Sequence, residues 1–367
     1  MPEKISWQAL SQIGNGDLPS IKRRLKNNFN TSDDDGLYPI QYASENGNKE
    51  MMELFLAQKD IDVNVLDPWG CTPLHQAVKS GRVEIVKLLL NHSGITDVNA
   101  RDTEGFYPIT HAVSKEMMEL LLSNPDIDVN VLDPEDRTSL HIAVISGRVE
   151  IVELLLSHSG TNDVNTKYAY GLHPINHAAV INTPKGIELL LEHPSINVIA
   201  QGPKGYTALN KAARYGKVEI VKLLLNYNAE PNIRELVGGE TPLHKAAYYY
   251  QMNNNRDDCL EVIKLLVKGG ANLGAMNYGR PGDQNDGKSP IDFLPAGVPN
   301  EVLDVCVVRV SRVEEEDGKV KDGVKLINPF HQPQIHISDR RSGLRRNLVP
   351  QNRCRIKNKS DEPRCRG

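Results

Sequence analysis

The stretch 70–81, GCTPLHQAVKSG, decides the fold of this chain. It predicts a short helix that Thr72 caps, Pro73 begins and Gly81 ends. Proline is tolerated at the first helical position because its missing N–H would have no partner within the helix. The apolar spacing of 83–90, VEIVKLLL, predicts a second, amphipathic helix directly afterwards. One unit is therefore a turn, two short helices and a loop.

This unit recurs along the chain with a period near 34 residues. The turn is marked by glycine, or once by aspartate, at intervals of 34, 35, 31, 35, 34 and 34 residues. These turn positions are Gly36, Gly70, Gly105, Asp136, Gly171, Gly205 and Gly239. A unit of this size cannot bury its apolar side alone, so neighbouring units must share one core. The sequence therefore predicts an all-α solenoid, a single stack of short helix pairs.

Two segments carry a resemblance to a known family: GCTPLHQAV at 70–78 and GETPLHKAA at 239–247 resemble the ankyrin repeat. Seven units follow this pattern over roughly residues 5–306, and they begin near residues 33, 67, 102, 133, 168, 202 and 236. The resemblance implies an ankyrin-repeat solenoid of helix-turn-helix units with short hairpin loops. In that family, hairpin tips and first helices line a concave face that binds partner proteins.

The pattern divides the chain into four segments. Residues 1–32 are expected to form N-terminal capping helices, 33–276 the seven ankyrin-like repeats, and 277–306 an extended hairpin loop with a C-terminal capping repeat. Residues 307–367 are expected to form a basic tail that is disordered or weakly structured, because Pro, Asn and charged residues interrupt its apolar stretches. The alternative for this tail is a set of short strands at 307–310, 320–327 and 334–338.

Some units depart from the repeat pattern. Tyr38, Tyr107 and His173 replace the capping threonine in the first, third and fifth units, and each replacement removes a side-chain hydrogen bond worth about 1 kcal/mol. The third unit is also shorter between its helices, since its segment 108–117 matches the longer segment 73–85 of the second unit. We therefore expect the third unit to be the weakest link of the stack.

Composition narrows the cellular setting. The chain has no run of about 18 apolar residues, so it offers no transmembrane helix, and its first ten residues lack the order of a signal peptide. Five scattered cysteines without a Cys-x-x-Cys pair argue against a disulfide framework or a zinc ribbon. A cytoplasmic compartment is the expectation. The alternatives are the nucleus or, for a bacterial source, delivery into a host cell.

Charge is unevenly distributed along the chain. Residues 331–367 hold ten Lys or Arg and three Asp or Glu, a balance of +7, which leaves −11 for residues 1–330 out of a total of −4. The basic cluster at 340–346, RRSGLRR, fits nuclear import, an acidic partner, nucleic acid or anionic lipid, with a solvated tail as the simpler interpretation. The acidic body argues against nucleic acid on the concave face.

No catalytic residue, cofactor or metal site is predicted. The chain lacks a phosphate-binding loop, a His-Glu-x-x-His helix and a Gly-x-Ser-x-Gly elbow. His75, His141 and His244 occupy the Pro-Leu-His slot of the repeat, where the family uses the imidazole to bond neighbouring turns. The tail's histidines and cysteines, His331, His336, Cys354 and Cys365, match no common zinc spacing.

The second and fourth units indicate which face is specialised. Segments 66–99 and 132–165 are identical at 24 of 34 positions, and half of the ten differences fall on the hairpin tip or the open side of the first helix. Aromatic residues and arginine dominate binding energy at interfaces, and several occupy this face. The predicted partner-binding residues are Trp69, Phe106, Glu135, Arg137, Ile145, Tyr170, Tyr206, Arg214, Tyr215, Tyr248 and Tyr249.

The function expected from these features is a protein–protein interaction scaffold or adaptor without enzymatic activity. Three alternatives remain open. A bacterial effector directed at a host cell would use the same repeats, and a nuclear or chromatin-associated regulator would use the basic tail. An enzyme would need its activity in residues 301–367, a mostly polar segment too short to enclose a pocket readily.

Overall fold

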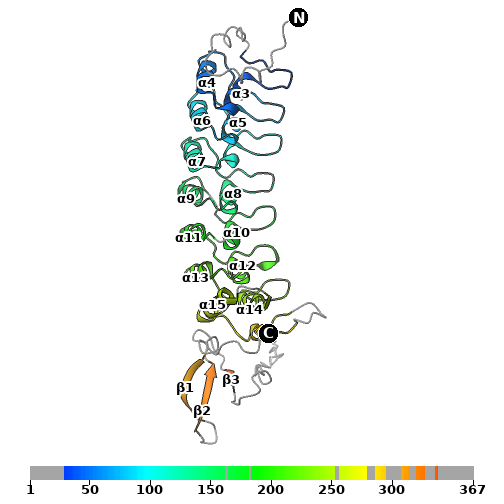
Figure 1. Cartoon of the computed structure of the whole chain (residues 1–367), viewed down its shortest axis with the longest axis vertical. Coiled ribbons are helices and arrows are strands. Elements are labelled where there is room, and N and C mark those ends of the chain that lie inside the picture. The colour runs from blue at the N-terminus through cyan, green and yellow to red at the C-terminus, as the bar shows by residue number, and fades with distance from the viewer. Residues whose placement is uncertain are drawn as a thin grey trace, which may run out of the picture.

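The computed structural model describes residues 29–161, 164–181, 183–252, 256–278 and 286–294, together with three strands between 307 and 337. Helices pair in antiparallel fashion and the pairs stack into a column, with hairpin loops projecting from one side (Figure 1). We call these loops the fingers. The predicted all-α solenoid of short helix pairs is confirmed for the described part of the array.

The helices form two rows along the column (Figure 1). The inner row, next to the fingers, consists of α3 (Pro39–Asn46), α5 (Pro73–Lys79), the 3-10 helix η1 (Pro108–His111), α8 (Ser139–Ile145), α10 (Pro174–Ile181), α12 (Ala208–Arg214) and α14 (Pro242–Met252). The outer row consists of α4 (Lys49–Leu56), α6 (Val83–Leu90), α7 (Lys115–Leu122), α9 (Val149–Ser157), α11 (Pro184–Glu192), α13 (Val218–Asn226) and α15 (Arg256–Lys268). Two further 3-10 helices are η2 (Pro203–Gly205) and η3 (Pro290–Phe293).

One continuous core of aliphatic side chains runs through the stack. Val86 and Leu89 of α6, for example, are fully buried. Leu224 of α13, four units later, occupies the position of Leu89 and is also fully buried. Because each unit buries its apolar side on its neighbours, removal of one core side chain affects the stack rather than a separate domain.

Each finger closes through a recurring backbone bond. In the first six units the N–H of the first finger residue donates to the carbonyl four positions later, as Asp67 does to Cys71 at 3.1 Å. The Asp67 carboxylate also accepts from the N–H groups of Trp69 and Cys71 at 2.9 and 2.8 Å. The seventh finger is one residue longer, since Glu235 donates to Glu240.

The histidines of the repeat pattern have the predicted structural role. His141 Nδ1 accepts from the Thr138 N–H at 3.2 Å, and its Nε2 lies 2.8 Å from the Thr166 carbonyl in the next finger. His75 and His244 bond in the same way to the finger that follows each of them. One imidazole thus caps its own helix and ties two units together.

Asparagines that precede the fingers add a second set of ties between units. Asn64 Nδ2 donates to the Gly94 carbonyl at 2.8 Å, and Asn64 Oδ1 accepts from the Thr96 N–H at 3.2 Å. The same pair of bonds to the following unit is made by Asn99, Asn165 and Asn232. These bonds fix the spacing of the fingers.

The irregular units differ as expected. Tyr38 and Tyr107 provide no side-chain cap, whereas the first-turn side chains of Gln41 and Thr110 still accept the N-cap N–H, at 3.0 and 3.2 Å. In the third unit the inner helix shrinks to the four residues of η1. Both observations follow from the sequence changes in these units.

The tail contains strands at the three stretches where short strands were the alternative to disorder. β1 (Val307–Glu314), β2 (Val320–Leu326) and β3 (Ile335–Ile337) form an antiparallel sheet in the order β1-β2-β3. Val307 lies opposite Leu326, and the register shifts between Val310 and Val313. The expected capping helices before residue 29, the loop 279–285 and the cap 295–306 lie outside the described residues.

Candidate protein interface

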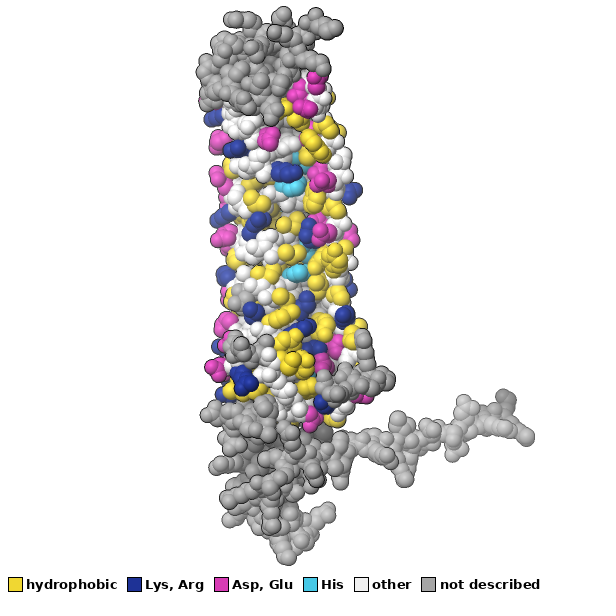
Figure 2. All heavy atoms as spheres, turned by 45° about the vertical axis from the view of Figure 1, so that its right-hand side comes forward, with side chains coloured by type: hydrophobic (Ala, Val, Ile, Leu, Met, Phe, Trp, Pro, Cys, Tyr) yellow, Lys and Arg dark blue, Asp and Glu magenta, His cyan; other side chains and the backbone are white. Residues whose placement is uncertain are grey.

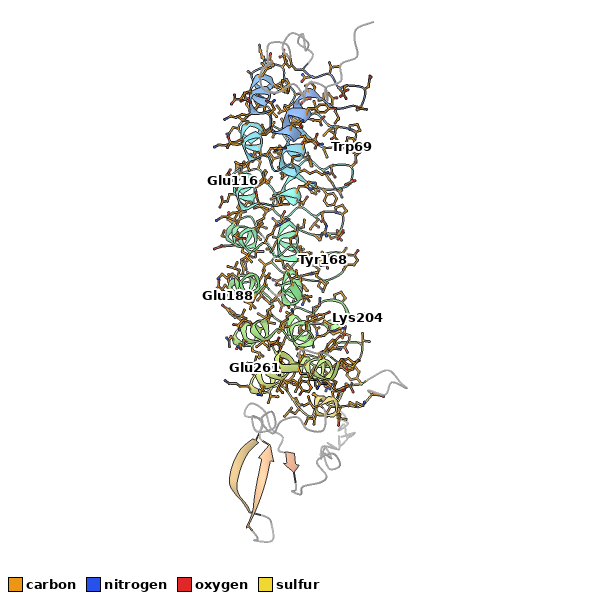
Figure 3. All side chains as sticks on the ribbon, viewed as in Figure 1. Trp69, Glu116, Tyr168, Glu188, Lys204 and Glu261 are labelled. Carbon is orange, nitrogen blue, oxygen red and sulfur yellow. The ribbon has the colours of Figure 1, made fainter. Side chains whose placement is uncertain are left out.

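The fingers and the open side of the inner row form one long face, which we call the finger face. Figure 3 shows Trp69, Tyr168 and Lys204 on the finger side of the column, whereas Glu116, Glu188 and Glu261 lie on the outer row. Trp69 is 56% exposed and Tyr170 is 64% exposed, so both side chains are accessible to a partner.

Several predicted partner-binding residues also make contacts within their own unit. Arg137 pairs with the Asp133 carboxylate at 2.7 Å and with Glu135 at 2.8 Å, and it is only 23% exposed. The Phe106 ring packs against His111 with 5.4 Å between ring centres. These contacts lie within the third and fourth units, and Ile145 of the fourth unit is partly buried.

The structure brings together the predicted residues of units six and seven. Arg214 Nε–H donates to the Tyr249 hydroxyl at 2.7 Å, and its guanidinium lies 5.5 Å from the centre of the Tyr215 ring and 5.1 Å from that of Tyr249. The Tyr249 ring is 6.4 Å from Tyr215 and 5.6 Å from Tyr248. We call Tyr206, Arg214, Tyr215, Tyr248 and Tyr249 the tyrosine cluster.

The members of the tyrosine cluster are not equally accessible. Tyr215 is 47% exposed, whereas Tyr248 packs its ring edge-on against Phe293 at 6.0 Å and contacts the core. Tyr206 lies beneath the ammonium of Lys245, 5.0 Å from its ring centre. Tyr248 therefore supports the fold as well as the surface. Figure 2 shows hydrophobic side chains with Lys and Arg between them over the lower half of this face.

A pocket of about 200 Å³ opens beside the tyrosine cluster. Its lining consists of His177, Val180, Tyr206, Lys211, Arg214 and Tyr215. Sequence reasoning missed the two α10 residues and Lys211, because nothing in the residue types alone sets them apart from ordinary helix-surface positions. The pocket lies where α10 and α12 pack side by side.

Electrostatics of this pocket are unusual. Burial, with a further contribution from the charge on Lys211, lowers the pKa of His177 to about 4. The His177 Nε2 lies 2.5 Å from the Tyr168 hydroxyl, so a neutral imidazole accepts this bond near pH 7. Burial also lowers the pKa of Lys211. Lys211 and Arg214 together give the pocket two basic side chains.

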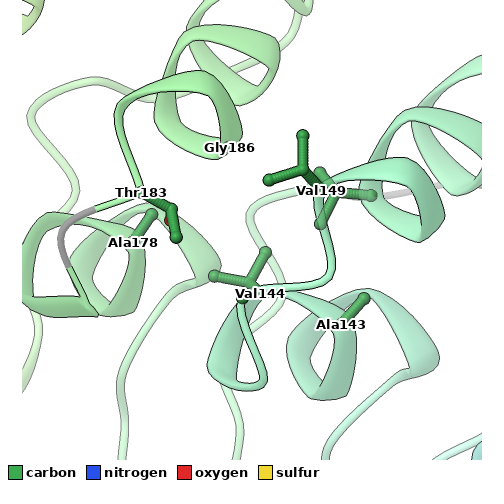
Figure 4. Close-up of a pocket in the computed structure, with 8 residues that line it drawn as sticks. Ala143, Val144, Val149, Ala178, Thr183 and Gly186 are labelled. Carbon is green, nitrogen blue, oxygen red and sulfur yellow. The ribbon is translucent and has the colours of Figure 1, made fainter. Parts of the chain in front are cut away.

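Among the residues that the structure describes, three other kinds of site can be considered. A crevice between units four and five, lined by Val144, Val149, Thr183 and neighbouring residues, is too tight to admit a water molecule (Figure 4). In the part of the chain that the structure describes, no three His, Cys, Asp or Glu side chains converge as metal ligands. Within that same part, no helix combines the length and the apolar character needed to cross a bilayer.

Comparison with known proteins agrees with the fold. The family model for ankyrin repeats, described as three copies, matches residues 8–102, 94–168 and 169–277. Ankyrin repeat protein nuc-2 of Neurospora crassa is 28% identical over 281 residues, and the match covers 73% of this chain and 24% of that protein. This chain therefore spans about a quarter of the length of that relative.

Two further similarities concern one type of protein. The mouse B-cell lymphoma 3 protein homolog is 31% identical over 222 residues, and the match covers 58% of this chain and 48% of that protein. The crystal structure of the ankyrin repeat domain of Bcl-3, described as a unique member of the IkappaB protein family, aligns with a TM-score of 0.51 at 28% identity. It covers 57% of this chain and 94% of that domain.

Proposed function

This chain belongs to the ankyrin repeat family, and on that premise we propose that it is a scaffold or adaptor that binds a partner protein on its finger face. Ankyrin repeats are in general protein–protein interaction modules. The observation that carries the proposal for this chain is the tyrosine cluster, a group of aromatic rings held on the surface around one arginine.

Two physical properties suit the cluster to binding. Tyrosine and arginine are the residue types that most often contribute 2 kcal/mol or more to an interface, about a factor of 30 in affinity. The hydrogen bond from Arg214 to Tyr249 and the tilted and edge-on contacts between the rings also hold the side chains in place before a partner arrives. Little side-chain entropy is then lost on binding.

The free thiols are consistent with the expected compartment. Cys71 and Cys259 are buried and unpaired, and burial raises the pKa of each thiol. Buried thiols that form no disulfide fit a reducing environment such as the cytoplasm or nucleus. We propose that the chain works in such a compartment.

Site-specific photocross-linking tests the proposed function. A photoreactive amino acid at Tyr215 of the full chain should cross-link a discrete partner protein in cells. The matched control carries the same amino acid at Glu261, which is exposed on the outer row in the seventh unit. A partner captured equally from both positions, or only from Glu261, would contradict binding on the finger face.

A further inference from the structure

A side-chain pair recurs between the inner helix and its finger. In three units the fourth residue of the inner helix bonds to the residue nine positions earlier, which begins the finger. The pairs are Tyr42 with Asp33 at 3.0 Å, Gln76 with Asp67 at 2.7 Å, and His177 with Tyr168 at 2.5 Å. The first two place a carboxylate of the chain itself over the inner helix.

The sixth unit breaks this pairing. Its fourth inner-helix residue is Lys211, and nine positions earlier stands Gly202, which has no side chain. Among the described residues, the Lys211 ammonium has neither a hydrogen bond nor an ion pair. The seventh unit shows the contrast, since Lys245 at the same position pairs with the carboxylate of Glu240. Lys211 is therefore a basic side chain that lacks the carboxylate partner.

The surroundings of Lys211 form a receptive pocket. Arg214 lies one helical turn further on the same face of α12 and adds a second positive charge. The pocket has a volume of about 200 Å³, and no carboxylate is among its lining residues. Such a volume suits a short side chain. An ammonium without a counter-ion in a partly buried site is costly unless an anion arrives.

The tyrosine cluster is not an open cage for a cation. The Arg214 guanidinium already lies over the rings of Tyr215 and Tyr249, and the Lys245 ammonium lies over Tyr206. The cluster therefore presents positive charge with aromatic edges around it. A ligand complementary to it carries negative charge and apolar groups next to that charge.

We propose that this pocket receives the carboxylate of an Asp or Glu side chain from an otherwise apolar segment of the partner protein. The inference rests on the proposed function and specifies the partner's chemistry. The carboxylate takes the place that Asp33 and Asp67 fill in their own units and that Gly202 leaves empty. Lys211 and Arg214 bind it, while Tyr215 and Val180 contact its apolar neighbours.

Peptide selection tests the proposal directly. Random short peptides displayed on phage are selected on the full chain, and the affinities of synthetic copies are measured by fluorescence anisotropy. The selected peptides should share one Asp or Glu beside apolar residues. Changing that residue to the matching amide should weaken binding at least roughly tenfold, and Lys211→Met should do the same. When the amide peptide is tested on Lys211→Met, the combined loss in binding free energy should be smaller than the sum of the two single losses, because both changes remove the same contact.

Other outcomes separate the two proposals. Selected peptides that bind Lys211→Met normally but lose affinity for Tyr215→Ala would overturn the acid pocket and leave the proposed function standing. Selected peptides without a shared acid, or no selected peptide at all, would also overturn the inference, and the cross-linking experiment then decides the proposed function. A phosphoserine peptide that binds at least roughly tenfold more tightly than its Glu counterpart would assign the pocket to a phosphoryl group.

Stability provides a second readout that needs no ligand. Lys211→Met removes an uncompensated charge, so its urea midpoint should equal or exceed that of the unaltered protein. The matched control Lys245→Met leaves Glu240 without its partner and should lower the midpoint. A loss for Lys211→Met as large as that for Lys245→Met would show that Lys211 has a partner within the fold and would overturn the inference.

Discussion

The Arg214 Nε–H group donates to the Tyr249 hydroxyl at 2.7 Å, and this bond crosses from α12 of the sixth unit to α14 of the seventh. This bond links the two neighbouring units at the centre of the tyrosine cluster. The surface that we assign to the partner is consequently set by the stacking of units and not by one finger.

Tyr215→Ala should weaken partner binding at least roughly tenfold while the free energy of unfolding changes by less than about 1 kcal/mol, because this ring is half exposed. Affinity is measured by titration with the partner protein that the cross-linking experiment identifies, and stability is measured by urea unfolding. The matched control is Tyr227→Ala, an exposed tyrosine at the end of α13 on the outer row, which should leave affinity unchanged. Equal losses for both variants would contradict the assignment.

Tyr248→Ala should behave differently from Tyr215→Ala. Its ring packs on Phe293 and on the core, so we expect a loss of about 1–3 kcal/mol in stability beside any loss of affinity. Urea unfolding of the two single variants compares them directly. A Tyr248→Ala protein as stable as Tyr215→Ala would show that the contact with Phe293 contributes nothing.

Leu89→Ala should cost roughly 2–5 kcal/mol, because Leu89 is fully buried between stacked helices and its removal leaves a cavity. Lys79→Ala, at the exposed end of α5 in the same unit, should change stability by no more than about 0.5 kcal/mol. Both are measured by urea unfolding. Similar values for the two would mean that the buried and exposed faces have been exchanged.

Acid should destabilise the array through its capping histidines. Burial lowers the pKa of His141 to about 4 from an ordinary value of 6.5, so the unfolded chain binds the proton more readily. The contribution of neutral His141 to the free energy of unfolding is therefore fully present above about pH 6.5 and falls as the pH drops toward 4. About 1–2 kcal/mol of it is lost between pH 7 and pH 5.

His141→Asn provides the control for that prediction. The sixth unit already uses Asn210 at this position, where its Oδ1 accepts from the Thr207 N–H at 2.9 Å, so the cap survives without a titrating group. The unfolding free energy of His141→Asn should fall less between pH 7 and pH 5 than that of the unaltered chain. An identical fall in both proteins would rule out His141 as a source of the acid sensitivity.

The third unit should open more readily than its neighbours. Its inner helix has only the four residues of η1, compared with seven in α5 and in α8. Amide hydrogen exchange should therefore be faster over 108–117 than over the matching segment 73–85. Equal protection in the two segments would show that the shortened helix is compensated by its neighbours.

The helices were predictable from the sequence because their signals are local. Pro73 fixes a first turn, Thr72 caps it and Gly81 ends it, and the same residues recur in other units. The side chains that meet on the finger face were only partly predictable. Aromatic residues at exposed helix positions indicated the tyrosine cluster, whereas Arg137 was expected to face a partner and instead pairs with Asp133 and Glu135.

Lys211 shows why part of the candidate site could not be predicted from the sequence. Its lack of a counter-ion depends on Gly202, nine positions earlier, and on a pairing that becomes visible only once the finger is seen to fold over the inner helix. An alignment of the seven units at the first finger residue would have indicated the missing counter-ion, since aspartate occupies this position in the first four units and glycine only in the sixth. Ionic contacts across a turn are set by geometry that residue types alone do not specify.

The central claim is that units six and seven of the finger face, and not the basic tail, hold the partner. One titration series tests this claim. It measures the dissociation constant of the partner protein identified by cross-linking for the unaltered chain, for Tyr215→Ala and for a chain that ends at residue 330. We predict a loss of at least roughly tenfold for Tyr215→Ala and of less than about threefold for the shortened chain. Normal binding by Tyr215→Ala together with lost binding by the shortened chain would contradict the claim.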